Sequence, residues 1–161
     1  MSTSDIHLKL DGIKGESTDA RHRDEIVVDS WSWGVAANLP ASGGGSSVSK
    51  PTFSDLSFTH RVDRASPLLW RACASGRHIK EAVLSVTRAG SATQDYLTIR
   101  LRNVIVTAVA LADAAADSAP PLETVSMAFG SLRYGYRAQR PNGALEPALA
   151  FSHDRKTGKS S

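Results

Sequence analysis

Hydrophobic and polar residues alternate along most of this chain, which is the pattern of strands buried on one face rather than of helices. A short opening strand over residues 6–10 precedes the turn dipeptide Asp11-Gly12. The longer alternating runs cover residues 25–35, 53–62, 82–87, 96–111 and 125–136. The pattern predicts a mainly β fold, either a barrel or two packed sheets.

The run over residues 25–35 places two tryptophans on one face and two serines on the other. The first face holds Val27, Trp31, Trp33 and Val35. The second holds Ile26, Val28, Ser30 and Ser32, and becomes polar toward its end. Because aromatic side chains bury a large area and are enriched at interfaces, Trp31 and Trp33 are predicted as core anchors or as a subunit contact.

The alternation changes phase twice in the later strands. Leu97, Ile99 and Leu101 share a face, but after Asn103 the apolar positions shift by one residue. A second shift follows Gly130. A bulge or bend at Asn103 and a hinge at Gly130 would explain these shifts.

One helix is predicted, over about Pro67 to Ser75. Ser66 is a suitable N-cap, Pro67 suits the first helical position, and Gly76 is a typical stop signal. Its expected apolar stripe consists of Leu68, Leu69, Ala72 and Cys73.

Composition narrows the function classes. The chain has 161 residues, enough for a single domain, and one cysteine, which excludes an internal disulfide and a multi-cysteine zinc site. It has 19 basic and 16 acidic residues, but three of the basic ones lie in the tail over residues 152–161. The rest is nearly neutral, so we expect no nucleic-acid partner. No run of about 20 apolar residues predicts membrane insertion, and the N-terminus does not resemble a signal peptide.

Candidate catalytic groups are sparse. The histidines lack metal-ligand spacing, so no metal or other cofactor is expected. His22 follows Ser17 and Asp19 in a polar loop. We interpret these residues as pinning the loop through hydrogen bonds to backbone groups, in preference to a hydrolytic Asp19–His22 pair. The sequence does not predict an enzyme.

An ordered set of motifs resembles Hcp, the tube protein of the bacterial type VI secretion system. The motifs are Lys9 to Asp19, His22, Trp31 to Gly34, Asp55 to Thr59, Ala72 to Gly76 and Tyr96 to Ile99. The resemblance implies a compact β-barrel of two packed antiparallel sheets with one flanking helix. It also implies hexameric rings that stack into a tube, carry effectors and are secreted from the bacterial cytoplasm without a signal peptide.

The resemblance further implies particular surfaces and partners. The partners are other copies of the chain, the VgrG spike protein, the sheath, the baseplate and effector proteins. The extended loop over residues 38–50 would reach the adjacent ring through Ser42, Gly43, Gly44, Gly45, Ser46 and Ser47. Ser30 and Ser32 would face the lumen. Relatives commonly carry a Gly-Trp pair near the C-terminus, where this chain has Ser152-His153.

A second function remains open from the residues alone. A monomeric β-barrel that binds carbohydrate or another small ligand could use Trp31, Trp33 and the loop over residues 38–50 as its site. The two hypotheses differ in whether the tryptophans pack or stand exposed.

Overall fold

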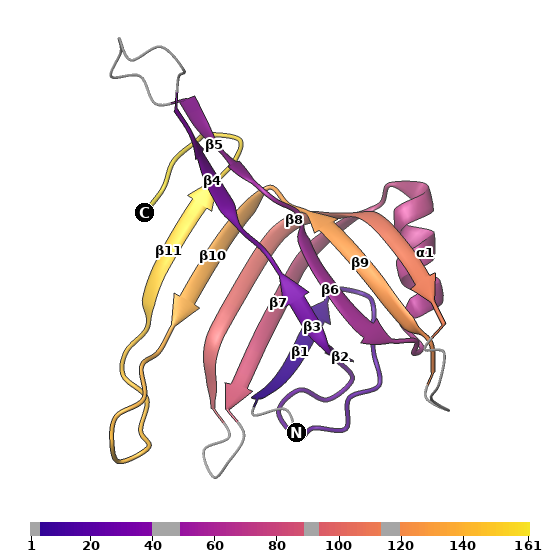
Figure 1. The fold of residues 1–161 in the computed structure, drawn as a ribbon, viewed down its shortest axis with the longest axis horizontal. Coiled ribbons are helices and arrows are strands. Elements are labelled where there is room, and N and C mark those ends of the chain that lie inside the picture. Colours follow the sequence, from indigo (N-terminus) through magenta and orange to yellow (C-terminus); the bar gives the residue numbers. More distant parts are fainter. Residues whose placement is uncertain (1–3, 40–48, 89–93, 114–119) are drawn as a thin grey trace.

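The computed structural model describes residues 4–39, 49–88, 94–113 and 120–161. Within these residues it is mainly β with a single helix, as the alternation predicts (Figure 1). The elements are β1 (Ser4–Leu10), β2 (Ile26–Val27), β3 (Ser30–Ser32), β4 (Val35–Asn38), β5 (Ser49–Phe53), β6 (Leu56–Arg61), α1 (Ser66–Ser75), β7 (His78–Arg88), β8 (Asp95–Ala112), β9 (Leu122–Ala128), β10 (Ser131–Tyr136) and β11 (Leu149–Asp154). None of the described residues belongs to a helix long and apolar enough to cross a bilayer.

The large antiparallel sheet is organised around β8, its longest strand. One edge of β8 pairs with β7. The other edge pairs first with β10 and then with β9, so the sheet forks along β8. The complete order is β2-β1-β7-β8-β9-β6-β3, with β10 and β11 branching from the first half of β8.

The fork lies where the two phase shifts were predicted. Asn103 has a φ of 54°, a left-handed conformation that turns the strand's faces. The N–H of Gly130, between β9 and β10, donates to the carbonyls of Arg102 and Asn103. A Cβ at Gly130 would lie 3.1 Å from that of Asn103, a tight contact that favours glycine here. Both predicted irregularities are confirmed.

The predicted strand over residues 25–35 is instead three short strands. β2 pairs with β1, and β3 pairs with β6. Between them, the N–H of Val28 donates to Ile6 and that of Asp29 donates to Thr59. Because the chain changes partner here, its buried face also changes. Val27 is therefore exposed, contrary to the prediction that it shares a face with Trp31.

This segment brings the two ends of the curled sheet together without a continuous ladder. Among the described residues, β2 contacts β6, but no ladder joins them. The large sheet is therefore curled but not closed into a hydrogen-bonded barrel, which departs from the predicted barrel.

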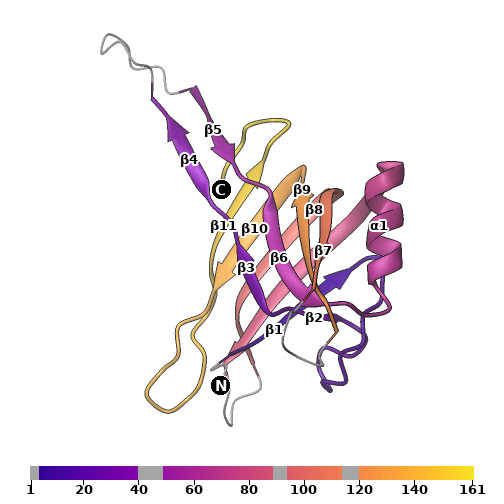
Figure 2. The same ribbon diagram turned by 45° about the vertical axis from the view of Figure 1, so that its right-hand side comes forward.

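The second sheet consists of β4 and β5 alone, and this hairpin projects from the body (Figure 2). Val35 in β4 is 58% exposed, which also departs from the predicted face. The two sheets are antiparallel as expected, but they are unequal. The packed layers come from opposite parts of the larger sheet.

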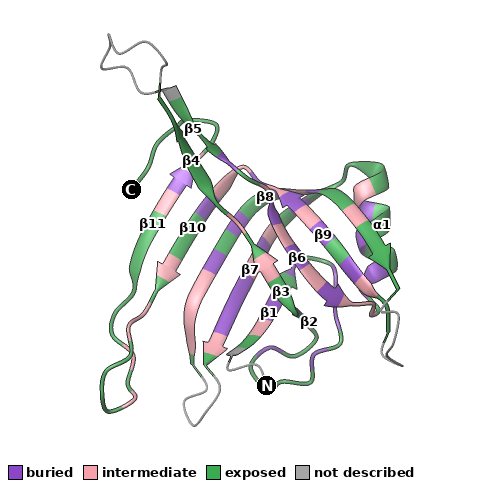
Figure 3. Cartoon of the chain, in the orientation of Figure 1, coloured by how far each residue is buried: buried purple, intermediate pink, exposed green. Residues whose placement is uncertain are grey.

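The core lies inside this curled sheet. Alternate residues of β6 and β9 are buried, giving the banded colouring of these strands in Figure 3. Leu8, Phe58, Leu84, Ile99 and Met127 are each at most 1% exposed and come from five different strands. Complete burial of such a side chain contributes about 1.5–3 kcal/mol.

Helix α1 begins one residue earlier than predicted, with Ala65 rather than Ser66 as its N-cap. Its end is as predicted, since Gly76 has a left-handed φ of 65°. Leu69 and Ala72 are buried as predicted. Leu68 is exposed, so its assignment to the buried apolar stripe was wrong.

The tail folds back on β11. Ser152 and Ser161 exchange backbone hydrogen bonds, and the Asp154 carboxylate accepts the N–H groups of Lys156 and Thr157. His153 is buried, with its ring 4.9 Å from that of Phe53. The His153 side chain is therefore packed against the body of the fold.

Candidate functional site

Six hydroxyl side chains lie together on the outward face of β3, β6 and β9. We call this surface the hydroxyl face; it consists of Ser30, Ser32, Ser57, Thr59, Thr124 and Ser126. It exists because the opposite residues of these strands, such as Phe58 and Val125, point into the core. Alternation therefore leaves small polar side chains outside.

The register of the strands aligns these hydroxyls in two rows. Ser30, Thr59 and Thr124 are successive partners across the sheet, and β8 continues their row with Ala110. The second row consists of Ser32, Ser57, Ser126 and Ala108. Both rows contain only small uncharged side chains, so the face is smooth and electrically neutral.

Several of these hydroxyls bond to each other. The Oγ of Ser30 pairs with Oγ1 of Thr59, and the Oγ atoms of Ser57 and Ser126 lie 2.8 Å apart. Charges occur at the margin, where Arg61 lies 3.7 Å from Asp29. The face thus satisfies part of its own hydrogen-bonding capacity and offers no charge to a passing molecule.

Sequence reasoning named Ser30 and Ser32 but missed the other four hydroxyl residues. The alternation of residues 53–62 does place Ser57 and Thr59 on a polar side. The pairing of Ser57 with Ser126, however, joins residues 69 positions apart. A single sequence does not specify that register.

Trp31 and Trp33 are half-buried and pack against the core. Trp31 pairs in register with Phe58, and the ring of Trp33 lies edge-on to Phe129 at 5.6 Å. The indole N–H of Trp33 donates to the carbonyl of Ser54 at 3.1 Å. The indoles therefore pack against the rest of the fold.

The residues predicted for ring stacking, Ser42 to Ser47, lie outside the described residues. The structure does describe the stem that leads to them. The side-chain amide of Asn38 donates to the carbonyl of Lys50 at 2.8 Å and to Oγ1 of Thr52 at 2.7 Å. These bonds join β4 to β5 at the projecting end of the hairpin (Figure 2).

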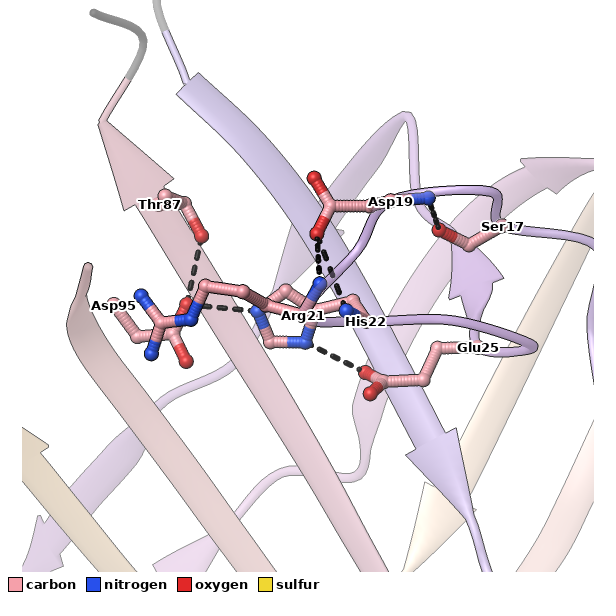
Figure 4. A network of polar contacts seen from close by, with 7 residues as sticks. All are labelled: Ser17, Asp19, Arg21, His22, Glu25, Thr87 and Asp95. Carbon is pink, nitrogen blue, oxygen red and sulfur yellow. Dashed lines mark hydrogen bonds and ion pairs between the residues drawn. The ribbon is translucent and has the colours of Figure 1, made fainter. Parts of the chain in front are cut away.

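The loop that contains His22 is held by side chains, as predicted, although the ring of His22 bonds to other side chains instead of backbone groups (Figure 4). The Oγ of Ser17 accepts the backbone N–H of Asp19 at 3.2 Å. Asp19 accepts the backbone N–H groups of Arg21 and His22. The His22 ring does not bond to backbone; its Nδ1 lies 3.0 Å from Glu25 and its Nε2 lies 2.9 Å from Asp95. The alternative of an Asp19–His22 side-chain pair is therefore wrong.

Electrostatics favour a charged His22. Burial lowers the pKa of His22, but the hydrogen bonds and charges of Asp95 and Glu25 outweigh it and hold this pKa above its ordinary value. His22 thus ties the loop to the start of β8 through Asp95.

A buried network beneath α1 was missed by sequence reasoning. Nε2 of His60 lies 2.7 Å from Oε1 of Glu123, and both side chains are completely buried. Oε2 of Glu123 accepts the indole N–H of Trp70 at 2.8 Å. His60 does share the periodicity of Leu56 and Phe58, which is the signal that could have indicated its burial. Among the described residues no group of side chains has the arrangement of a metal site.

Comparisons with known proteins agree with this architecture. The family described as "Type VI secretion system effector, Hcp" matches residues 7–136. Protein hcp1 of Pseudomonas aeruginosa is 36% identical over 144 residues, covering 88% of each chain. A solved structure of a type six secretion system protein superposes with a TM-score of 0.90 at 25% identity, covering 98% of this chain and 99% of the other. Hcp1 from Salmonella typhimurium has a TM-score of 0.81 at 33% identity, with coverage of 99% and 100%.

The family match spans most of the chain, and the fold agrees with solved members along nearly their whole length. Members of this family are structural, secreted proteins that build the tube of the type VI secretion system and assemble into rings. The chain belongs to the Hcp family of type VI secretion proteins.

Proposed function

We propose that this protein forms hexameric rings whose lumen is lined by the hydroxyl face, and that stacked rings carry effectors through the type VI machine. The observation that carries the proposal is the alignment of Ser30, Thr59 and Thr124 with Ser32, Ser57 and Ser126 in two uncharged rows. A lumen through which different effector proteins move is best lined by small, neutral, hydrated side chains, because these bind no particular cargo tightly.

Self-association is supported by a second surface. Tyr134 pairs with Phe151 and Tyr136 with Leu149, so these four apolar side chains share one face of β10 and β11. All four are exposed, and Leu149 is 77% exposed. Exposed apolar side chains that gather in one place are typical of protein contacts. A ring closed by heterologous contacts would cover them.

The β4–β5 hairpin supports the proposed contact between rings. It projects from the body, and residues 42–47 follow β4 and precede β5 in the sequence. The further proposed partners are the VgrG spike protein, the sheath and the baseplate. The protein would be made in the bacterial cytoplasm and exported by the machine itself.

The lumen assignment can be tested with charge. In the double variant S57E/S126E, two facing hydroxyls become carboxylates on the hydroxyl face. We expect rings to form, because neither residue packs in the core, but co-purification of an effector with the rings should fall at least tenfold. Ser152→Glu, on the outward side of β11, is the matched control and should leave effector binding unchanged.

Electron cryomicroscopy of the rings gives the direct measurement. The hydroxyl face should line the sixfold axis. A ring in which this face points outward or lies between subunits would refute the assignment, and a strictly monomeric protein at high concentration would refute the ring itself.

A further inference from the structure

Two histidine rings are stacked beneath the loop over residues 15–25, away from the hydroxyl face. The ring centroids of His7, in β1, and His22, in the loop, lie 4.7 Å apart, and the ring planes differ by 10°. Both residues are buried, with 5% and 7% of their surfaces exposed. The pair lies where the loop meets β1 and the start of β8.

Each nitrogen of the His22 ring faces a carboxylate. Nδ1 lies 3.0 Å from Glu25, and Nε2 lies 2.9 Å from Asp95. An ionised carboxylate can only accept, so both nitrogens must donate, as only imidazolium can. Asp95 also accepts the hydroxyl of Thr87, which fixes its orientation (Figure 4).

His7, in contrast, is held as a neutral ring. Burial and the nearby charge of His22 lower the pKa of His7, against the weaker upward effects of Asp19, Glu25 and Asp5. Its buried Nδ1 has no hydrogen-bond partner in the described structure, so a charge there gains no direct stabilisation. A neutral ring thus lies flat on a charged one.

We propose that His7 and His22 form an acid-sensitive clasp, which holds the 15–25 loop against β1 and β8 while only His22 is charged and loosens when both rings are charged. This inference goes beyond the tube function. Protonation of His7 would place two stacked positive charges in a buried site.

The acidic groups around the pair already have other partners, so they offset the second charge only in part. Oδ1 of Asp19 accepts two backbone N–H groups, and one oxygen each of Glu25 and Asp95 lies against the His22 ring. Asp5, on the strand of His7, is exposed and therefore screened by solvent.

The remaining elements bring no anion to the pair. From β7, Ser85 and Thr87 face this side of the sheet, and Arg88 is engaged with Gln139 and stacked on Tyr96. From β2, the register partner of His7 is the uncharged Val27. Arg21 and Arg23 of the loop are exposed cations.

The pKa shifts of His7 and His22 make the stability of the loop depend on pH in opposite directions. Because the pKa of His7 is lowered on folding, acidification below the ordinary value of about 6.5 favours the open loop. Because the pKa of His22 is raised, its stabilisation is lost as pH rises through its folded value. The clasp is therefore tightest between these two pKa values. Each unit of difference between folded and unfolded pKa changes the opening equilibrium about tenfold.

Hydrogen-exchange mass spectrometry of the full chain, from pH 8 to pH 4.5, tests this proposal. Exchange at the histidine ring carbons reports the pKa of each histidine, and His7 should titrate below 6.5 and His22 above it. Amide exchange of the 15–25 loop, corrected for its intrinsic pH dependence, should rise as His7 titrates. The core ladder between β7 and β8 should stay protected.

Variants separate the clasp from general acid effects. His7→Phe keeps a flat ring on His22 but cannot be protonated, so the acid-induced rise in loop exchange should disappear. His78→Gln removes an exposed histidine of β7 and should leave the rise intact. If His7→Phe does not fold, His7→Gln serves the same comparison. An unchanged acid response in the folded His7 variant, or a His7 that titrates at or above 6.5, would overturn the proposal.

Discussion

At the scale of single residues, the buried pair of His60 and Glu123 is the most demanding feature of the core. Both side chains are completely buried, and the indole N–H of Trp70 donates a hydrogen bond to the second carboxylate oxygen of Glu123. Because an unpaired buried charge is costly, each member depends on the other. The network also ties α1 to β9, which hydrophobic contacts alone would do less specifically.

Glu123→Ala should therefore destabilise the protein by about 3–5 kcal/mol, since it removes the partner of His60 Nε2 and the acceptor for Trp70 and leaves only Asp63, 3.8 Å from His60 Nδ1, beside the ring. Urea unfolding at a fixed protein concentration measures the loss. The double variant H60L/E123L should lose less than Glu123→Ala, because it removes both polar groups together. A larger loss in the double variant would show that the pair itself stabilises the fold.

At the scale of elements, the two ends of the 15–25 loop lie unusually close together. A Cβ at Gly15 would lie 2.5 Å from the carbonyl oxygen of Glu25. The N–H of Gly15 also donates to the carbonyl of Asp24 at 2.8 Å. The backbone of Gly15 is not in the left-handed region, so its conformation alone does not call for glycine. The close approach of Glu25 does, because a Cβ would collide with it.

Gly15→Ala should cost about 1–3 kcal/mol, because the backbone of the loop or of β2 must move. Gly34→Ala is the matched control, since a Cβ there meets nothing within 4 Å, and its effect should stay within about 0.5 kcal/mol. Thermal unfolding of both variants checks the contrast. Equal melting temperatures would show that the loop moves aside at little cost.

The β4–β5 hairpin is the element that we assign to contact between rings. Removing residues 42–47 and joining the stem with a two-residue turn should leave hexamers intact, because the stem bonds of Asn38 to Lys50 and Thr52 remain. Stacking should weaken, seen as shorter tubes by negative-stain microscopy at equal protein concentration. Loss of the hexamers themselves would contradict this division between the hairpin and the ring contact.

At the scale of the whole molecule, the sequence predicts those parts of the fold that depend on local pattern. The phase shift at Asn103 is visible because the apolar residues on either side of it change parity. The change of partner at Asp29 is equally sharp, but it was missed, because a strand's parity says nothing about which strand lies beside it. For the same reason, Ser30 and Ser32 could be assigned to a polar surface while their neighbours on β6 and β9 could not.

The fork along β8 has a consequence for the order in which the chain becomes structured during synthesis. The edge of β8 that faces β7 can pair as soon as β8 leaves the ribosome, because β7 is synthesised before it. Its second edge needs β9 and β10, which are made later. Until residues 122–136 have left the ribosome, 18 residues of strand present an open row of donors and acceptors, a template for unwanted pairing. A nascent chain that stalls between β8 and β10 is therefore the form most exposed to aggregation.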